Sequence, residues 1–192
     1  YMNPFHVDCT APAFWKQKIK EYSEIGLEYL VIMAVANERQ AYYPSSFMKH
    51  AYPSSRQSPV EAIMEAADQY GMKVFMSCGW AVNQDDNIRE PTIKELQQKI
   101  MKETADLFKE HKSFYGWYLP VEDMIAPYLS DHAIEAVNTL AESARNLTPQ
   151  AQIMISPYGL YSADIRNPKF GEQIKKLKVD IIAYQDEVGC VR

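Results

Sequence analysis

Residues 116–123 read GWYLPVED, an aromatic and apolar run that ends in a proline and is followed at once by two carboxylates. A run of this length and character predicts a buried strand. In a parallel barrel, catalytic side chains come from the carboxyl ends of the strands, where the loops to the helices begin. The stretch therefore predicts a strand that ends at the rim of such a barrel and places Glu122 in the cup above it.

Strand-like and helix-like segments alternate along the chain. The runs at 28–36 and 72–78 are apolar without period-two alternation, as expected of parallel strands buried on both faces. The predicted strands are residues 4–8, 28–36, 72–78, 114–119, 152–157 and 180–184. The predicted helices are 12–25, 59–70, one opening at Pro91 with an apolar face of Leu96, Ile100, Leu107 and Phe108, one capped by Ser130, and 168–177. The polar connection 37–57 is longer than usual and is predicted to be a functional loop.

This order of elements carries no β-hairpin signal and predicts a parallel sheet with helical crossovers. A (β/α)8 barrel and a doubly wound sheet both fit it. The barrel is favoured because polar and aromatic residues gather in the loops after the strands, and because no glycine-rich phosphate loop follows the first strand. A full barrel typically needs about 250 residues. We therefore expect residues 1–192 to form one α/β domain, a TIM-type barrel truncated after its sixth strand.

Composition excludes several classes of protein. The formal net charge is −5, from 20 basic and 25 acidic residues, which argues against nucleic acid as the main partner. No apolar run approaches the roughly 20 residues of a membrane span. The three cysteines form no CxxC pair and the four histidines show no HxH or HExxH spacing, so we expect neither a metal site nor a cofactor. The thirteen tyrosines suit either a sugar-binding cleft or ordinary core packing. The sequence leaves the oligomeric state open.

Two carboxylates are the candidate catalytic groups. Glu122 follows the fourth predicted strand; a glutamate beside aromatic walls has its pKa raised by desolvation, which suits a general acid. Its neighbour Asp123 faces the other way in an extended chain and is interpreted as a supporting or capping group. After the sixth strand, Gln185 and Asp186 would sit at the barrel mouth, able to bind hydroxyls or to orient Glu122, and Asp186 or Glu187 would be the second carboxylate.

Aromatic and polar side chains after the other strands are the candidate substrate-binding groups. Since strand residues alternate, Trp117 and Tyr118 cannot both face the lumen. The full set predicted to bind substrate is Trp80, Tyr118, Tyr158, Tyr184, Gln185 and Glu187. Each has a structural alternative, as core, turn or solvated loop.

The motifs GWYLPVED at 116–123, ISPYG at 155–159 and DIIAYQDEVG at 180–189 resemble the glycoside-hydrolase-like TIM barrels of domain-of-unknown-function family 4434, common in gut Bacteroides. The similarity covers essentially the whole chain, including YLVIMAVANERQAYYPSS at 29–46 and GMKVFMSCGW at 71–80. It implies a carbohydrate-active barrel that is exported to the periplasm or the cell exterior.

The wider clan of retaining glycosidases on this barrel carries its acid/base glutamate after strand four, and the resemblance carries that role to Glu122. The clan's nucleophile follows strand seven, which this sequence lacks. Clan members often have asparagine before the acid/base, where Val121 stands here.

Two functions follow as hypotheses. The first is a glycoside hydrolase acting on a polysaccharide or glycan, with Glu122 as general acid/base; a carboxyl separation of about 5–5.5 Å would imply retention and about 6.5–9.5 Å inversion. The alternative is a carbohydrate-binding barrel without catalysis. A metal-assisted or aldolase-type barrel ranks last, because neither a histidine cluster nor a lysine stands at a strand end.

Overall fold

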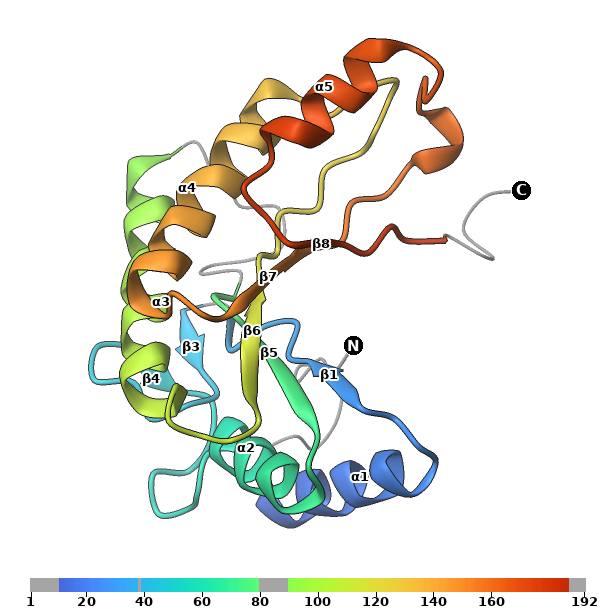
Figure 1. Cartoon of the computed structure of the whole chain (residues 1–192). Helices are drawn as coiled ribbons and strands as arrows, with labels where there is room; N and C mark the ends of the chain where they lie inside the picture. The colour runs from blue at the N-terminus through green and yellow to red at the C-terminus, as the bar shows by residue number, and fades with distance from the viewer. Residues whose placement is uncertain (1–10, 38, 80–89, 187–192) are drawn as a thin grey trace.

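A curled parallel sheet organises the chain in the computed structural model, which describes residues 11–37, 39–79 and 90–186. The strands of this sheet, in spatial order, are β1 (Tyr29–Val31), β5 (Lys73–Ser77), β6 (Phe114–Tyr118), β7 (Gln152–Ile155) and β8 (Ile181–Ile182). Every neighbouring pair is parallel. The described part of the chain is therefore a mixed α/β half-barrel, open on one side (Figure 1).

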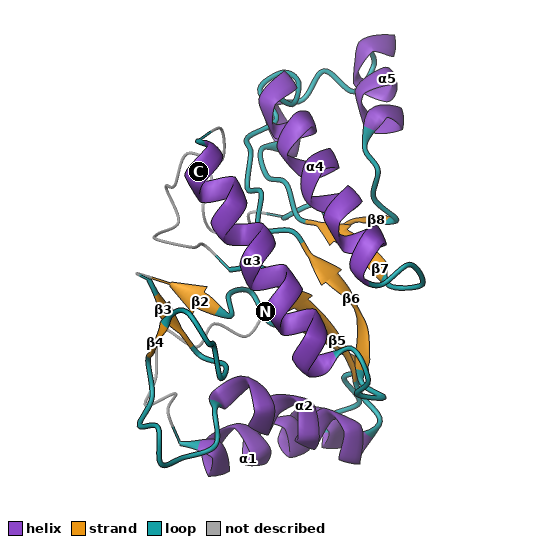
Figure 2. Ribbon diagram, turned by 90° about the vertical axis from the view of Figure 1, so that its left-hand side faces the viewer, coloured by secondary structure: helices purple, strands orange, loops and turns teal. Residues whose placement is uncertain are grey.

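Helices cover the outer, convex side of this sheet (Figures 1 and 2). They are α1 (Pro12–Glu24), α2 (Pro59–Tyr70), α3 (Pro91–Phe108), α4 (Asp131–Leu147) and α5 (Pro168–Lys176), with a 3-10 turn, η1 (Leu160–Ser162), before α5. The predicted starts are confirmed: Ser58 and Glu61 form a capping box at α2, and the Ser130 side chain accepts from the backbone N–H of Ala133 at α4. Gly71 ends α2 in the left-handed conformation.

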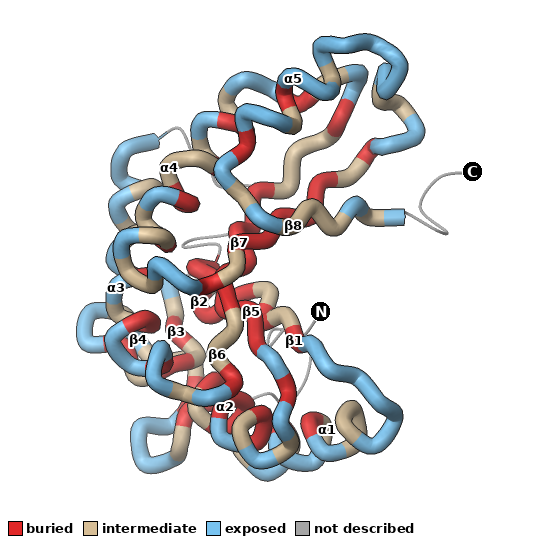
Figure 3. Tube along the Cα trace, in the orientation of Figure 1, coloured by how far each residue is buried: buried red, intermediate tan, exposed pale blue. Residues whose placement is uncertain are grey.

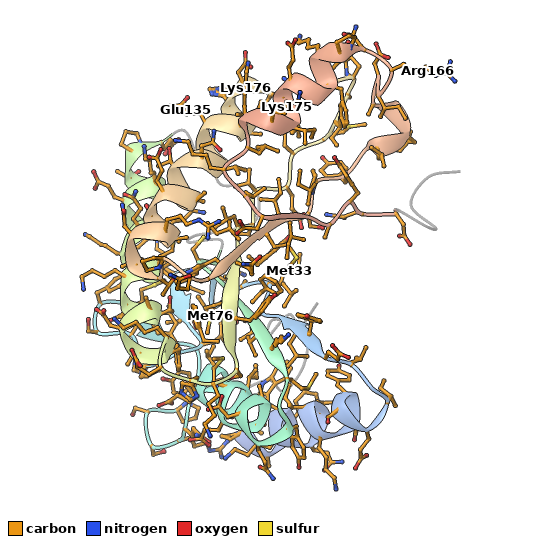
Figure 4. The ribbon with its side chains drawn as sticks, in the orientation of Figure 1. Met33, Met76, Glu135, Arg166, Lys175 and Lys176 are labelled. Atoms are coloured by element: carbon orange, nitrogen blue, oxygen red, sulfur yellow. The ribbon has the colours of Figure 1, made fainter. Side chains whose placement is uncertain are left out.

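The two faces of the sheet carry different side chains. The face toward the helices belongs to the main core, which includes Met76 and Trp117. The central strands β5 and β6 are buried toward their carboxyl ends (Figure 3). The opposite, concave face carries a second cluster of Phe75, Tyr118 and Met154, with further apolar residues packed against it. Figure 4 shows Met33 on the open side of the sheet and Met76 on the helix side. Trp117 and Tyr118 thus face opposite ways, as alternation predicts.

Gly116 fixes how closely β6 approaches its neighbours. A Cβ at this position would lie 2.2 Å from the carbonyl oxygen of Gln152 and 2.9 Å from Cε1 of Phe75. Gly116 pairs with both of these residues, and the register shifts between Val74 and Phe75 just before it. The strand can take this register because the position has no side chain.

The connection 37–57 is more structured than predicted. It contains an antiparallel pair, β2 (Ala36–Asn37) and β3 (Gln40–Ala41), and a third strand, β4 (Lys49–His50). The expectation of no hairpin was wrong, because the turn uses Arg39 at φ 58° instead of a glycine or asparagine that would have marked it. Glu103 of α3 anchors this small sheet: its carboxylate accepts from the Ser45 hydroxyl at 2.6 Å and the Ser46 N–H at 2.5 Å.

Other boundaries and faces also differ from expectation. The predicted strand 28–36 is shorter, since Ala36 leaves the main sheet for the small one. Leu107, predicted on the apolar face of α3, is 42% exposed, because the helix turns it away from the core that Ile100 and Phe108 join. The predicted strand 4–8 lies outside the described residues.

Replacing Gly116 by alanine tests the close approach of β6. We expect Gly116→Ala to lower the free energy of unfolding by about 2 kcal/mol or more, because overpacking a core costs about 1–3 kcal/mol. Gly171→Ala is the matched control: a Cβ there meets nothing within 4 Å, and alanine in a helix is favoured by about 0.5–1 kcal/mol. Urea denaturation measures both. Equal effects at the two sites would contradict the packing argument.

Candidate functional site

The site is built where β6, β7 and β8 end. Their register aligns Tyr118 with Met154 and Met154 with Ile181. Because the strands are parallel, the residues that follow these positions meet at one edge of the sheet. Glu122, Tyr158 and Gln185 each come four residues after their aligned position. The loops after these three strands therefore bring the predicted polar groups to the same edge.

Glu122 is half-buried directly after β6. The β6–β7 pairing extends one residue past the strand, where the Leu119 N–H donates to the Met154 carbonyl oxygen at 2.9 Å, and a tight turn follows from Val121 N–H to Leu119 O. The Tyr118 hydroxyl donates to Glu122 Oε1 at 3.4 Å. The carboxylate is thus held above the concave face by a group from the strand beneath it.

Tyr118 itself is fully buried on the concave face, in the cluster with Phe75 and Met154. Its ring is covered by protein, so the sugar-facing surface expected of it is not exposed. Its hydroxyl is directed to Glu122. Tyr118 therefore supports the candidate carboxylate from below.

Asp123 organises the loop that carries Glu122. Its Oδ2 accepts from the backbone N–H of Ser130 at 3.0 Å, immediately before α4, and its carbonyl oxygen accepts from the Tyr158 N–H at 3.4 Å. These contacts agree with the supporting role predicted for Asp123.

The loops after β6 and β7 are locked together at Gly159. Met124 and Tyr158 form a parallel bridge, and the Ile125 N–H donates to the Tyr158 carbonyl oxygen at 2.9 Å. Gly159 has φ 81°, and a Cβ there would lie 2.8 Å from Met124 Cγ. A side chain at this position would be strained and would push the two loops apart. The half-buried Tyr158 is held at this junction.

The end of β8 is tied to the end of β7 by Gln185. Its N–H donates to the Pro157 carbonyl oxygen at 3.1 Å, and its side-chain Nε2 donates to the Ser156 carbonyl oxygen at 2.9 Å. The Gln185 amide nitrogen therefore holds the loop backbone after β7. Asp186 follows and is exposed. Tyr184 is 36% exposed. The burial of the rest of its side chain raises the pKa of its hydroxyl, which therefore stays protonated and can donate a hydrogen bond.

The structure thus brings Glu122, Tyr158, Gln185 and Asp186 to one edge of the sheet and buries Tyr118 below them. Trp80 and Glu187 lie outside the described residues. Sequence reasoning missed Ser156, which is buried and donates from Oγ to the Ala183 carbonyl oxygen at 2.8 Å. Alternation from Met154 could have placed it on the concave face.

Metal-type clusters are not seen among residues 11–37, 39–79 and 90–186: no three His, Cys, Asp or Glu side chains come together there. His111 pairs with Asp68, Nδ1 to Oδ2 at 2.8 Å, and so joins the end of α2 to the turn after α3. Within the same described segments, no helix is long and apolar enough to cross a membrane.

The family model described as "Domain of unknown function (DUF4434)" matches residues 2–192. No curated protein matches the chain.

Three solved structures share the fold. The first is a Bacteroides thetaiotaomicron protein described as a "putative alpha-L-fucosidase", with a TM-score of 0.70 and 18% identity over 92% of this chain and 58% of that one. A β-galactosidase from Marinomonas ef1 gives 0.67 and 8%, over 96% of this chain and 40% of that one. The xylanase TsXylA from Thermoanaerobacterium saccharolyticum gives 0.55 and 14%, over 82% and 55%. The half-barrel is therefore similar to glycoside hydrolase barrel domains, and the chain spans between two fifths and three fifths of these proteins.

Cys78 directly follows β5, and its burial can be tested by chemical modification. The thiol is fully buried, and burial raises its pKa to about 12. Since the thiolate is the reactive form, we expect no alkylation of Cys78 by iodoacetamide in the folded protein at pH 8, and rapid alkylation in urea. Peptide mapping by mass spectrometry separates Cys78 from Cys9 and Cys190. Native alkylation as fast as in urea would show that β5 ends in an accessible thiol.

Proposed function

The chain belongs to the DUF4434 family, and we propose that it is a glycoside hydrolase in which Glu122 is the general acid/base. One observation carries the proposal: a half-buried glutamate follows a parallel strand at the edge of a half-barrel like those of glycoside hydrolases, with a buried tyrosine hydroxyl on its carboxylate. Such edges carry the chemistry of barrel enzymes. The substrate class is a polysaccharide or glycan.

The proposal includes a (β/α)8-type barrel, of which this chain forms the part up to the sixth strand. Support comes from the parallel strand order, the curl of the sheet and the position of the described helices on its convex side (Figure 1). The concave face carries apolar side chains such as Phe75 and Met154 that fill the interior of a barrel. Further strands beyond β1 and β8 would close it around this cluster.

In this mechanism Glu122 donates its proton to the glycosidic oxygen as the bond to the anomeric carbon breaks. Asp186 is the proposed second carboxylate. It would attack the anomeric carbon in a retaining enzyme, or take a proton from the attacking water in an inverting one. Its backbone neighbour Gln185 is anchored to the β7 loop by two hydrogen bonds, which would fix where Asp186 begins.

A carbohydrate-binding barrel without catalysis is the second candidate. One feature favours it: Asp186, the proposed second carboxylate, is exposed, whereas exclusion of water from a site strengthens the electrostatic interactions that catalysis uses. In that case Glu122 and Tyr158 would bind sugar hydroxyls only.

We also propose export to the periplasm or the cell exterior, because polysaccharide substrates are found there. Cell fractionation would test this localisation.

The direct test of catalysis is Glu122→Gln. The amide has nearly the same size as the carboxyl group and can still accept a hydrogen bond, but it has no acidic proton to donate. On any substrate found active among aryl glycosides and polysaccharides, we expect kcat to fall by about 10²–10⁴, the contribution of a general acid. Glu135→Gln is the control, since Glu135 lies exposed on the outer helix α4 (Figure 4). A loss of only a few fold would remove Glu122 from the acid role.

The hydroxyl of Tyr118 provides a second test. Tyr118→Phe removes one hydrogen bond to Glu122, worth about 1 kcal/mol, and we expect kcat to fall about fivefold. In a double mutant with Glu122→Gln, the same change should have little further effect, because the group it positions is already altered. Steady-state kinetics of the four proteins measure this coupling. Fully additive losses would mean that Tyr118 acts elsewhere.

A further inference from the structure

The loop between β7 and α5 exposes three large apolar side chains within six residues. Leu160 is 38% exposed, Tyr161 61% and Ile165 63%. Single exposed apolar residues are ordinary, but several on one short loop mark a contact surface. This loop follows directly after Tyr158 and Gly159, which belong to the candidate site.

Hydrogen bonds hold this loop in one shape. The Ser162 N–H donates to the Gly159 carbonyl oxygen at 2.9 Å, and the Asp164 N–H donates to the Pro127 carbonyl oxygen at 3.1 Å. The Tyr128 hydroxyl donates to Asp164 Oδ2 at 3.2 Å. The exposed side chains are therefore carried on a frame that is fixed to the loop of Glu122, and binding there would cost little ordering entropy.

A second exposed apolar group has a simpler explanation. This group is Ile25 and Leu27, which precede β1, and Tyr29, with which β1 begins. Strand β1 is the outermost strand of the described sheet, and these residues lie at the amino end of the strands. A further strand added to β1 would lie beside them. The loop of Tyr161 instead follows the carboxyl end of a strand, on the face where barrel enzymes bind substrate.

The surroundings of Tyr161 suit a sugar ring. A pyranose has an apolar C–H face and a rim of hydroxyls, so it is bound by an aromatic ring together with polar side chains. Asp164, Arg166 and Asn167 are all exposed on the same loop, and Figure 4 shows Arg166 projecting outward from it. A purely apolar partner would leave these charges without water.

We propose that Tyr161 is the stacking platform of a subsite that binds a sugar unit of an oligosaccharide, away from the bond cleaved at Glu122. Its ring would lie against the apolar face of the pyranose, while Asp164 and Arg166 would bind hydroxyls. The inference rests on the proposed function for its substrate class, but binding at Tyr161 needs no catalysis.

Affinity electrophoresis in gels containing xylan, galactan, fucoidan or polygalacturonate tests the subsite. We expect at least one of them to retard the protein. The affinity for that polysaccharide should fall about tenfold or more in Tyr161→Ala and should be kept in Tyr161→Phe, which preserves the ring. Ile25→Ala is the control, since Ile25 is 74% exposed at the opposite end of the sheet. Urea denaturation of each variant confirms that it is folded.

The outcomes separate the subsite from the catalytic proposal. Retardation lost in Tyr161→Ala but kept in Tyr161→Phe and Ile25→Ala supports the subsite, whether or not hydrolysis is found and whatever Glu122→Gln does to it. Retardation equal in Tyr161→Ala and wild type, or absent with all four polysaccharides, overturns it and leaves Glu122 to its own test. Dissociation of a dimer by Tyr161→Ala, seen by analytical ultracentrifugation without any polysaccharide effect, also overturns it and assigns the loop to a second copy.

Discussion

The parallel register of β6, β7 and β8 is the constraint on which the rest of the structure depends. It aligns Tyr118, Met154 and Ile181, and so brings three loops to one edge. The register needs β6 and β7 to approach closely, which Gly116 permits. Hydrophobic burial on both faces then favours this one alignment, because a slip by one residue would turn Tyr118 to the helix side and Trp117 to the concave side.

Glu122 takes its position from two levels of this arrangement. The strand below supplies the Tyr118 hydroxyl, and the loop around it is fixed by Asp123 and by the bridge to Tyr158. A carboxylate held in this way before substrate arrives needs little reorganisation, which is the usual condition for efficient proton transfer. The same contacts would serve a binding site for sugar hydroxyls, so the geometry suits both proposed functions.

Much of the fold could be predicted from local sequence signals. The capping box at Ser58 and the alternation of apolar runs with helices depend on residues close in sequence, and both appear as predicted. The hairpin at 36–41 could not be predicted, because Arg39 takes a left-handed conformation without a glycine signal. For the site, the edge positions of Glu122 and Gln185 followed from the strand ends. The burial of Tyr118 and the use of the Gln185 amide by the β7 loop depend on register and tertiary packing, which no local pattern encodes.

The interlock at Gly159 has a consequence for how such proteins diversify. The loops after β6 and β7 share backbone hydrogen bonds and a packing contact that admits no side chain, so neither has an independent conformation. Insertions in one would displace the other. Relatives with a different specificity would therefore be expected to change both loops together. A single loop transplanted into another protein would lose its conformation unless its partner loop were transplanted with it.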